Sequence, residues 1–249
     1  NTIAYNGSYG LYFYRSSTTY GKTTIVQNNI VIGNGGTSSS GYELYSYYYA
    51  PATCTNNIFW DKQGTTTYYR NSPYCTKTVA ENPLFVNAGS NDYRIYDRSP
   101  ARKAASDASD IGAIPWTNHL TNVLHGKLFQ NLILPAGTHT VAGDLLIPKG
   151  ITLTLSPGAV LKFNSSDDMY GGADKAKIEI IVEGKLAASG TATQKILMYY
   201  SSPTYTGRSS WYGIRVLAGG SLILNHASIR NVRYAVYNQG IVDISNIEI

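Results

Sequence analysis

Three phrases of the same kind open the sequence, and their repetition restricts the fold more than any other feature. They begin at Asn1, Asn29 and Asn57 and read NTIAYNGSYGLYFY, NNIVIGNGGTSSSGYELY and NNIFWDKQGTTTYY, so that successive phrases start 28 residues apart. Each phrase joins a short run of strand-forming residues, a polar corner and an aromatic strand. A period of this length with tight corners is typical of a solenoid. Because no helix-length amphipathic segment separates the strands, we expect coils of β-structure alone.

In-register stacking of such coils places equivalent side chains above one another. Inward strand positions then form apolar ladders, and an Asn at a recurrent corner adopts a left-handed conformation and hydrogen-bonds to its equivalent in the next coil. We therefore interpret these residues as structural rather than catalytic. The expected ladders are Asn1, Asn29 and Asn57 at one corner, Asn6 and Asn34 at another, and Ile3, Val31 and Phe59 inside the coils.

The composition also favours strands over helices. Only 14% of the residues are charged, well below the usual quarter, and the chain contains 22 Tyr. The net charge is +5, but Lys and Arg are scattered, so no nucleic-acid-binding patch is indicated. No segment approaches the ~18–20 apolar residues of a membrane-spanning helix. A chain that begins at Asn1 without Met is typical of a mature or excised piece.

Two cysteines, Cys54 and Cys75, lie close together in the sequence with no neighbouring His or third Cys. An isolated pair makes a poor metal site, so we expect a disulfide rather than two unpaired buried thiols. A disulfide implies an oxidising, extracellular setting. Closing a loop of about 20 residues stabilises a chain by roughly 3 kcal/mol in the chain-entropy description.

The most aromatic stretch is GYELYSYYY, which begins at Gly41. Strand alternation places Tyr45, Tyr47 and Tyr49 on one face. One interpretation is a contact surface, either for sugar rings or for lateral association of fibres. The other is an outer strand whose rings pack flat on the neighbouring coils.

The repeats are followed by ENPLFVNAGSNDYRIYDRSPARKAASDASDIGAIP, which resembles the ending of right-handed parallel β-helix proteins of the pectate-lyase-like superfamily. In that family a phrase of the form NPLFV…DYRI…SPA…DIGA closes the last coils. The resemblance implies an all-β fold, a right-handed parallel β-helix, whose closing phrase covers the last coil and its strand edge. None of the matching residues is catalytic. They are Asn82, Pro83, Leu84, Phe85, Val86, Asp92, Tyr93, Arg94, Ile95, Ser99, Pro100, Ala101, Asp110, Ile111, Gly112 and Ala113.

From Asn131 onward the sequence resembles the opening of a β-helix in bacterial and archaeal surface proteins. The resembling phrases include HTVAGDLLIPKGITLTLSPGAVLKF and WYGIRVLAGGSLILNHASIRNVRYAVYNQGIVDISNIEI. Trp211, Gly213 and Ile214 match a W-x-G-I coil of that family, and Gly and Pro residues mark the corners.

Two partial β-helices are therefore expected in one chain. Residues 1–116 would form the C-terminal part of one β-helix with its closing segment, residues 117–128 a linker, and residues 129–249 the N-terminal part of a second. This order leaves an open coil at each outer end, and the last phrase, YAVYNQGIVDISNIEI, and the first read as consecutive text of one β-helix. Open strand edges recruit other chains.

Relatives of this fold, such as pectate lyases, polygalacturonases and phage tailspikes, use clusters of acids on the outer face of adjacent coils, sometimes with Ca²⁺. The dense acidic group here is Asp167, Asp168 and Asp174, which offers oxygen ligands for Ca²⁺ or else forms a solvated loop. We assign no catalytic residue and expect no other cofactor. The pattern for N-glycosylation occurs at Asn6 and Asn164.

These observations lead to a structural extracellular or cell-surface protein as the first hypothesis. Each chain, or each repeat of a longer polypeptide, would complete its β-helix with the next and form a head-to-tail filament. The partner is then another copy of the chain. The alternatives are a β-helix that binds or cleaves polysaccharide, with lyase-like chemistry, and an adhesin domain of a larger surface protein.

Overall fold

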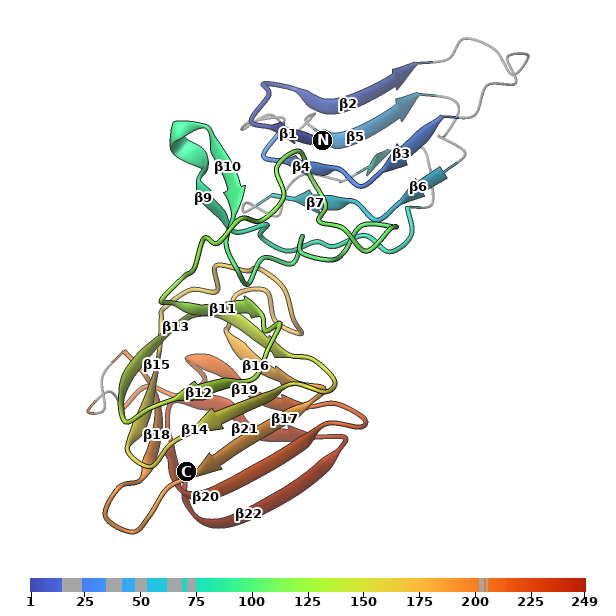
Figure 1. Cartoon of the computed structure of the whole chain (residues 1–249). Coiled ribbons are helices and arrows are strands. Elements are labelled where there is room, and N and C mark those ends of the chain that lie inside the picture. Colours follow the sequence, from blue (N-terminus) through green and yellow to red (C-terminus); the bar gives the residue numbers. More distant parts are fainter. Residues whose placement is uncertain are drawn as a thin grey trace. The chain divides into compact units, whose positions relative to one another are not determined.

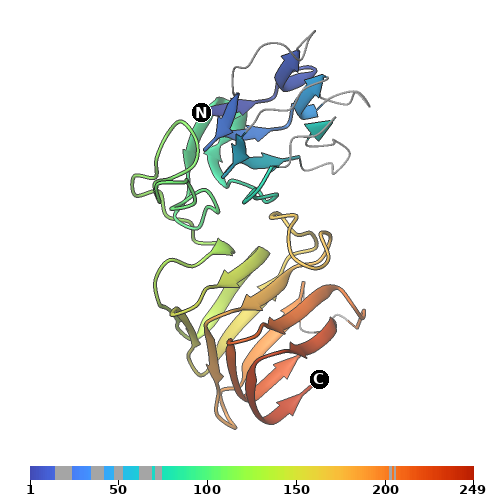
Figure 2. The same ribbon diagram turned by 90° about the vertical axis from the view of Figure 1, so that its right-hand side faces the viewer.

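The computed structural model describes residues 1–14, 24–34, 42–47, 53–61, 69–70, 75–201, 204 and 206–249. The fold is all-β and is dominated by parallel strand pairs (Figures 1 and 2). The chain divides into two compact units, Asn1–Leu120 and Thr121–Ile249. Within the described ranges, no helix is both long and apolar enough to cross a membrane.

The first unit contains three small parallel sheets, each built from strands that occupy equivalent places in the repeats. The strands are β1 (Thr2–Ala4), β4 (Ile30–Ile32) and β7 (Ile58–Trp60) in one sheet, β2 (Tyr9–Tyr14), β5 (Tyr42–Tyr47) and β8 (Tyr69–Arg70) in the second, and β3 (Ile25–Gln27) and β6 (Thr53–Thr55) in the third. Ile3 pairs with Val31, which pairs with Phe59, so the structure places these residues in one column.

Residues with positive φ form the sharp corners between these strands. Asn28 (φ 59°) and Asn56 (φ 52°) follow β3 and β6, and Tyr5 (φ 56°) and Gly33 (φ 59°) follow β1 and β4. Asn tolerates this left-handed region better than most residues with a side chain. The corners therefore recur at equivalent positions because the same backbone conformation is needed in each repeat.

The closing phrase runs along the side of the stack as well as folding on itself. It contains β9 (Phe85–Asn87), the short 3₁₀ helix η1 (Ala88–Ser90) and β10 (Asp92–Ile95), and β9 and β10 pair antiparallel. Farther on, Ala104 O accepts a bond from Asn56 Nδ2, Ser106 N donates to Asn28 Oδ1, and Ala113 N donates to Thr2 Oγ1. The segment thus contacts the corners of successive repeats, and not only the last coil as the resemblance implied.

The second unit is built on a 12-stranded sheet in which every strand pair is parallel. Its strands are β11 (Leu124–Lys127), β12 (Leu132–Leu134), β13 (Gly137–Ile147), β14 (Thr152–Leu155), β15 (Ala159–Phe163), β16 (Glu179–Val182), β17 (Lys185–Ser189), β18 (Ile196–Tyr200), β19 (Trp211–Val216), β20 (Ser221–Ile229), β21 (Val232–Asn238) and β22 (Ile241–Glu248).

The strands of this sheet form three runs. One run is β12, β14, β17, β20 and β22, the second is β13, β15, β18 and β20, and the third is β11, β13, β16, β19 and β21. The long strands β13 and β20 each belong to two runs, which joins the runs into one sheet. Figure 1 shows the turns of the chain that carry it from one run to the next.

Apolar columns fill the interior between the runs. Leu153, Leu186 and Leu222 are paired in sequence along the first run, and each is fully buried. Phe163 and Trp211 stack with their ring centroids 3.9 Å apart. The alternation of buried and outward residues along each strand follows from the period of two of extended chain.

The expected linker, residues 117–128, does not stay outside the second unit. Its last part forms β11, which pairs with β13, and Leu124 and Leu128 are buried in the apolar core. In the structure they cover the first turn of the sheet, together with Leu134.

We expect Leu222→Ala to reduce the free energy of unfolding of the second unit by about 2–5 kcal/mol, because the buried column would be left with a cavity. Val242 is the next residue in the same column but is only partly buried, so Val242→Ala is the matched control. Urea denaturation monitored by Trp fluorescence measures both variants. Equal losses in the two variants would contradict this account of the core.

Candidate functional site

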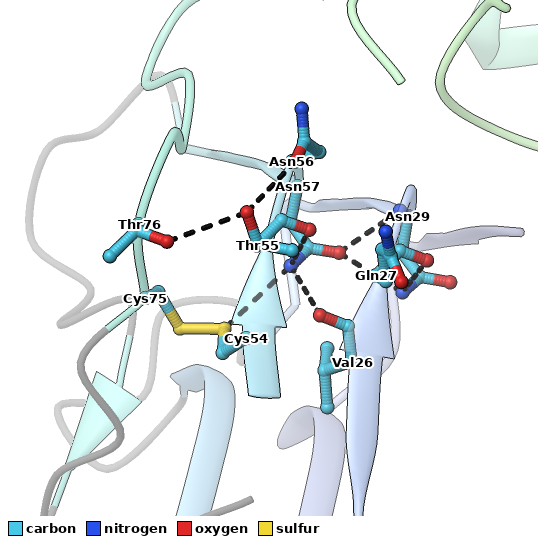
Figure 3. The surroundings of a disulfide bond; sticks show 9 residues. All are labelled: Val26, Gln27, Asn29, Cys54, Thr55, Asn56, Asn57, Cys75 and Thr76. Atoms are coloured by element: carbon cyan, nitrogen blue, oxygen red, sulfur yellow. Dashed lines mark hydrogen bonds between the residues drawn. A yellow bond between two sulfur atoms is a disulfide. The ribbon is translucent and has the colours of Figure 1, made fainter. Parts of the chain in front are cut away.

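A ladder of asparagine side chains links the repeats of the first unit, and Figure 3 shows its step between Asn29 and Asn57. Asn1 Nδ2 donates to Asn29 Oδ1 over 3.1 Å, and Asn29 Nδ2 donates to Asn57 Oδ1 over 3.0 Å. Asn57 is fully buried, and its amide also donates to the backbone oxygens of Val26 and Thr55. Burying an amide is costly unless its donors and acceptors are paired, and here they are. The structure thus places these three side chains in one ladder, but the left-handed corner residues are Asn28 and Asn56, one position earlier than expected.

The structure joins Cys54 and Cys75 in a disulfide (Figure 3). Cys54 lies in β6 and is buried in the small core beside Val26. Thr55 and Thr76, each next to one of the cysteines, form a parallel bridge, so the disulfide connects two neighbouring turns of the chain. The bond therefore reinforces the stack at the same corner as the Asn ladder.

A second polar network lies at the next corner, where a ladder of Asn6 and Asn34 was expected, and it includes Glu43, which was not foreseen. Asn34 Oδ1 accepts bonds from the backbone N and the Nδ2 of Asn6, at 3.0 and 2.8 Å. Asn34 in turn donates its backbone N to Glu43 Oε1 and its Nδ2 to Glu43 Oε2, at 3.0 and 2.6 Å. Gly10 leaves room for this network, because a Cβ there would lie 2.8 Å from Asn34 Nδ2.

Glu43 is fully buried, and burial raises the pKa of its carboxyl group from the ordinary value of 4.5 to about 7. The bonds from Asn34 act in the opposite direction but are outweighed by the loss of hydration. A single acid within the aromatic phrase GYELYSYYY was the only sequence signal of this group. Its burial depends on its bonds to Asn34, and nothing in the sequence placed Glu43 against that corner.

Tyrosine rings pack against one another on the outer side of β2 and β5. Tyr12 and Tyr45 stack with an interplanar angle of 1°, and Tyr9 and Tyr42 with an angle of 9°. This is the flat packing between coils that was one of the two expectations for this strand. The Tyr47 side chain and the whole of Tyr49 lie outside the described residues, so the surface expected from Tyr45, Tyr47 and Tyr49 is described only at Tyr45.

Each of the three aspartates proposed as Ca²⁺ ligands has partners of its own. Asp167 is buried and accepts backbone bonds from Asp144, Met169 and Gly171. Asp168 Oδ2 lies 2.7 Å from His125 Nδ1. Asp174 forms ion pairs with Lys177 and Arg233. Among the described residues, no group of three or more His, Cys, Asp or Glu side chains converges in a way that could hold a metal ion.

A buried ion pair beside the loop between β15 and β16, which carries these three aspartates, was also missed by the sequence analysis. Arg215 Nε donates to Glu179 Oε2 over 2.7 Å and its Nη2 to Oε1 over 3.1 Å, while Asp144 Oδ1 accepts the backbone N of Glu179. Glu179 Oε1 also accepts the backbone N of Ala173. These bonds hold the loop against the outer side of β13, β16 and β19, and Gly172 (φ 62°) is required there because a Cβ would meet Glu179 Oε1 at 1.8 Å. The spacing of the three charged residues along the sequence gave no sign of their proximity.

An exposed aromatic patch lies on β19 and β21, also unforeseen, and consists of Tyr212, Arg233, Tyr234 and Tyr237. The Tyr234 ring is tilted edge-on to both Tyr212 and Tyr237, at centroid distances of 5.5 and 6.4 Å. The Arg233 guanidinium lies 5.2 Å from the Tyr234 centroid. Tyr234 and Tyr237 are 43% and 45% exposed, so their rings are open to solvent.

The two residues that fit the glycosylation pattern have different surroundings. Asn6 contributes its amide to the network around Asn34. Asn164 follows β15 on an exposed turn. The fold and these sites thus define an all-β protein of stacked parallel strands, with polar groups at the corners.

The comparisons with known proteins add one partial relative. A segment of 119 residues is 30% identical to the protein bark beetle of Drosophila melanogaster. It comprises 47% of this chain but only 3% of that protein, so the chain spans a very small part of this relative. No protein family matches the chain, and no solved structure matches it.

Stability should depend on pH through Glu43. Because its pKa is raised in the folded chain, the protonated form is favoured by folding, and stability is lost as the pH rises from 4.5 to 7. We expect a loss on the order of 3 kcal/mol over this interval, from about 1.36 kcal/mol for each pKa unit.

Denaturation of the native chain and of Glu43→Gln across this pH range measures the effect. The variant should lack this part of the pH dependence, because its side chain does not titrate. Parallel pH profiles for the two proteins would show that Glu43 is not the responsible group.

Proposed function

We propose that the chain is a structural, non-catalytic part of an extracellular parallel β-helix, of the right-handed type found in the pectate-lyase-like superfamily, and that copies of it join head to tail. The order of the strands supports the β-helix. In the second unit the chain visits the three runs in the same sequence on each turn, as β14, β15 and β16 and then as β17, β18 and β19. A chain that does so traces successive coils of one solenoid.

The observation that carries the proposal is an uncovered apolar core at β21 and β22, called here the open layer of the second unit. Leu222, Leu224 and Ala227 in β20 are fully buried. Their paired residues in β22 are less covered: Val242 and Ile247 are partly buried and Ile244 is 37% exposed. The same columns that are sealed one strand earlier therefore end against solvent.

The first unit has a corresponding uncovered layer at β1 and β2. Val31 and Leu44 are fully buried, whereas their partners in the preceding strands, Ile3 and Leu11, are partly buried. The last strand at the other end of each stack is better covered, since Phe59 in β7 and Leu124 in β11 are both 2% exposed. Each unit thus presents one apolar layer to solvent.

A second copy of the chain is the partner that satisfies both layers. The open layer of one copy buries its apolar columns against β1 and β2 of the next, and the free backbone groups along β22 gain hydrogen-bonding partners. The contact joins two different surfaces and does not close on itself, so it propagates into a filament.

An extracellular location follows from the same proposal. A disulfide such as Cys54–Cys75 persists in oxidising compartments and is rare in the cytosol. The low content of charged residues and the Asn ladder are also suited to a durable assembly of stacked coils.

The test is assembly of the purified chain, measured by light scattering coupled to size-exclusion chromatography and by negative-stain electron microscopy. We expect filaments for the native chain and a loss of assembly in Ile244→Glu, because the contact would bury an unpaired carboxylate. A weakening of about 100-fold corresponds to roughly 3 kcal/mol. Ile244 is exposed enough for the single chain to accept the substitution.

Ile133→Glu is the matched control. Ile133 is 67% exposed in β12, on the outward side and away from the open layer, so this variant should assemble as the native chain does. Circular dichroism establishes that both variants are folded. A native chain that remains a monomer at all concentrations, or equal effects of the two substitutions, would contradict head-to-tail assembly.

Carbohydrate binding is a second candidate function, favoured by the aromatic patch on β19 and β21. Sugar rings pack on the faces of aromatic side chains, and Tyr234 and Tyr237 are tilted to each other rather than stacked, which leaves ring surface exposed. Arg233 adds hydrogen-bond donors beside the rings. Binding on this patch needs no catalytic group.

We expect Tyr234→Ala to abolish retention on immobilised polysaccharides, if the native chain is retained. Isothermal titration with soluble oligosaccharides then gives the affinity. Tyr12→Ala is the control, since Tyr12 is similarly exposed, at 49%, but stacks on Tyr45 in the first unit. Retention that is equal in the two variants would exclude the patch.

A further inference from the structure

Two asparagines of this chain fit the pattern for N-glycosylation, and the structure distinguishes between them. They are Asn6, followed by Gly7 and Ser8, and Asn164, followed by Ser165 and Ser166. We infer that Asn164 carries an N-linked glycan and that Asn6 remains unmodified. This inference rests on the extracellular location proposed above, but not on filament formation.

Asn164 has the surroundings of an accessible acceptor. It follows β15 directly, and its backbone N donates to Val141 O, which fixes the start of the turn. Asn164, Ser165 and Ser166 are all exposed. No hydrogen bond from the Asn164 side-chain amide occurs within the described part of the chain, so a glycan on Nδ2 displaces no internal contact. Acceptor sites of this kind lie on surface loops of secreted proteins.

Asn6 is also exposed to solvent, but its side-chain amide is part of the polar network around Asn34. Asn6 Nδ2 donates to Asn34 Oδ1 over 2.8 Å, and Asn34 is only 1% exposed. Asn34 Nδ2 reaches the buried Glu43 and the backbone oxygen of Ile3. A sugar on Asn6 Nδ2 would replace one of the two hydrogens of an amide that is held against the buried Asn34, so modification would crowd this corner.

The chemistry requires a donor supplied by the secretory pathway, an oligosaccharide linked through its first sugar to a lipid pyrophosphate. Nδ2 of Asn164 attacks C1 of that sugar and forms the C–N bond. The bond between C1 and the phosphate oxygen breaks, lipid pyrophosphate leaves, and the amide loses one proton to the transferring enzyme. The Ser166 hydroxyl completes the recognised pattern.

The position of Asn164 is also compatible with stacking of further coils. β15 pairs with β18, which pairs with β20, and only then follows β22. A glycan at Asn164 is therefore separated from the open layer by two strands. A glycan at Asn6, which directly follows the first turn, would instead lie beside β1 and hinder that layer.

The experiment is secretion of the whole chain from eukaryotic cells behind a cleavable leader, with mass spectrometry before and after endoglycosidase treatment. We expect one glycan, located at residue 164 by peptide mapping. It should disappear in Asn164→Gln and Ser166→Ala and remain in Asn6→Gln and Ser8→Ala. Chain retained in the secretory membranes is scored in the same way, so poor export does not prevent a result.

Two outcomes overturn the inference. One is a glycan on Asn6, alone or together with Asn164. The other is a chain that contains the Cys54–Cys75 disulfide but carries no glycan. Assembly is measured separately on the same material. Unglycosylated filaments would contradict this inference alone, whereas a glycosylated monomer would contradict only head-to-tail assembly.

Discussion

The whole structure depends on the in-register hydrogen bonding of short parallel strands. A strand of three residues such as β4 has no stability of its own, and it persists because β1 and β7 bond to its two edges. This requirement fixes the corners as well, because each turn must return the chain to the same place. The return requires left-handed backbone conformations at residues such as Asn28 and Asn56, which are unfavourable in free energy. The hydrogen bonds between Asn29 and Asn57 offset part of this loss.

The sequence predicted the first unit better than the second for a physical reason. Equal repeats place Asn29 exactly one period from Asn57, so register could be read from spacing. In the second unit the equivalent residues Thr152, Lys185, Ser221 and Ile241 are separated by 33, 36 and 20 residues. Insertions at the corners change the period without changing the pairing, and they conceal the repeat.

The candidate sites were also only partly predictable from the sequence. Asp167 and Asp168 are adjacent in the sequence, which suggested a shared ligand, yet one accepts backbone amides and the other contacts His125. Conversely, Glu179 and Arg215 are distant in the sequence and meet because their strands are neighbours. Residues that are adjacent in the sequence can point in different directions, so closeness along the chain is a poor guide to contact between side chains. The corner at Asn34 was expected from the repeats, but the sequence did not indicate that Glu43 would be buried against it.

The unequal sealing of each stack has a consequence for how the protein unfolds. Among the described strands, β11 pairs with β13 alone and β22 with β20 alone, but Leu124 and Leu128 beside β13 are buried, whereas Ile244 in β22 is 37% exposed. In the proposed β-helix, stability is a sum over neighbouring turns, so fraying begins at the less covered turn and advances inward. Amide exchange should therefore follow a gradient along the axis rather than a single cooperative opening. In the proposed β-helix, mechanical load on the strand pairs of the second unit would separate the less covered β22 before the better covered strands, so that the unit yields in steps.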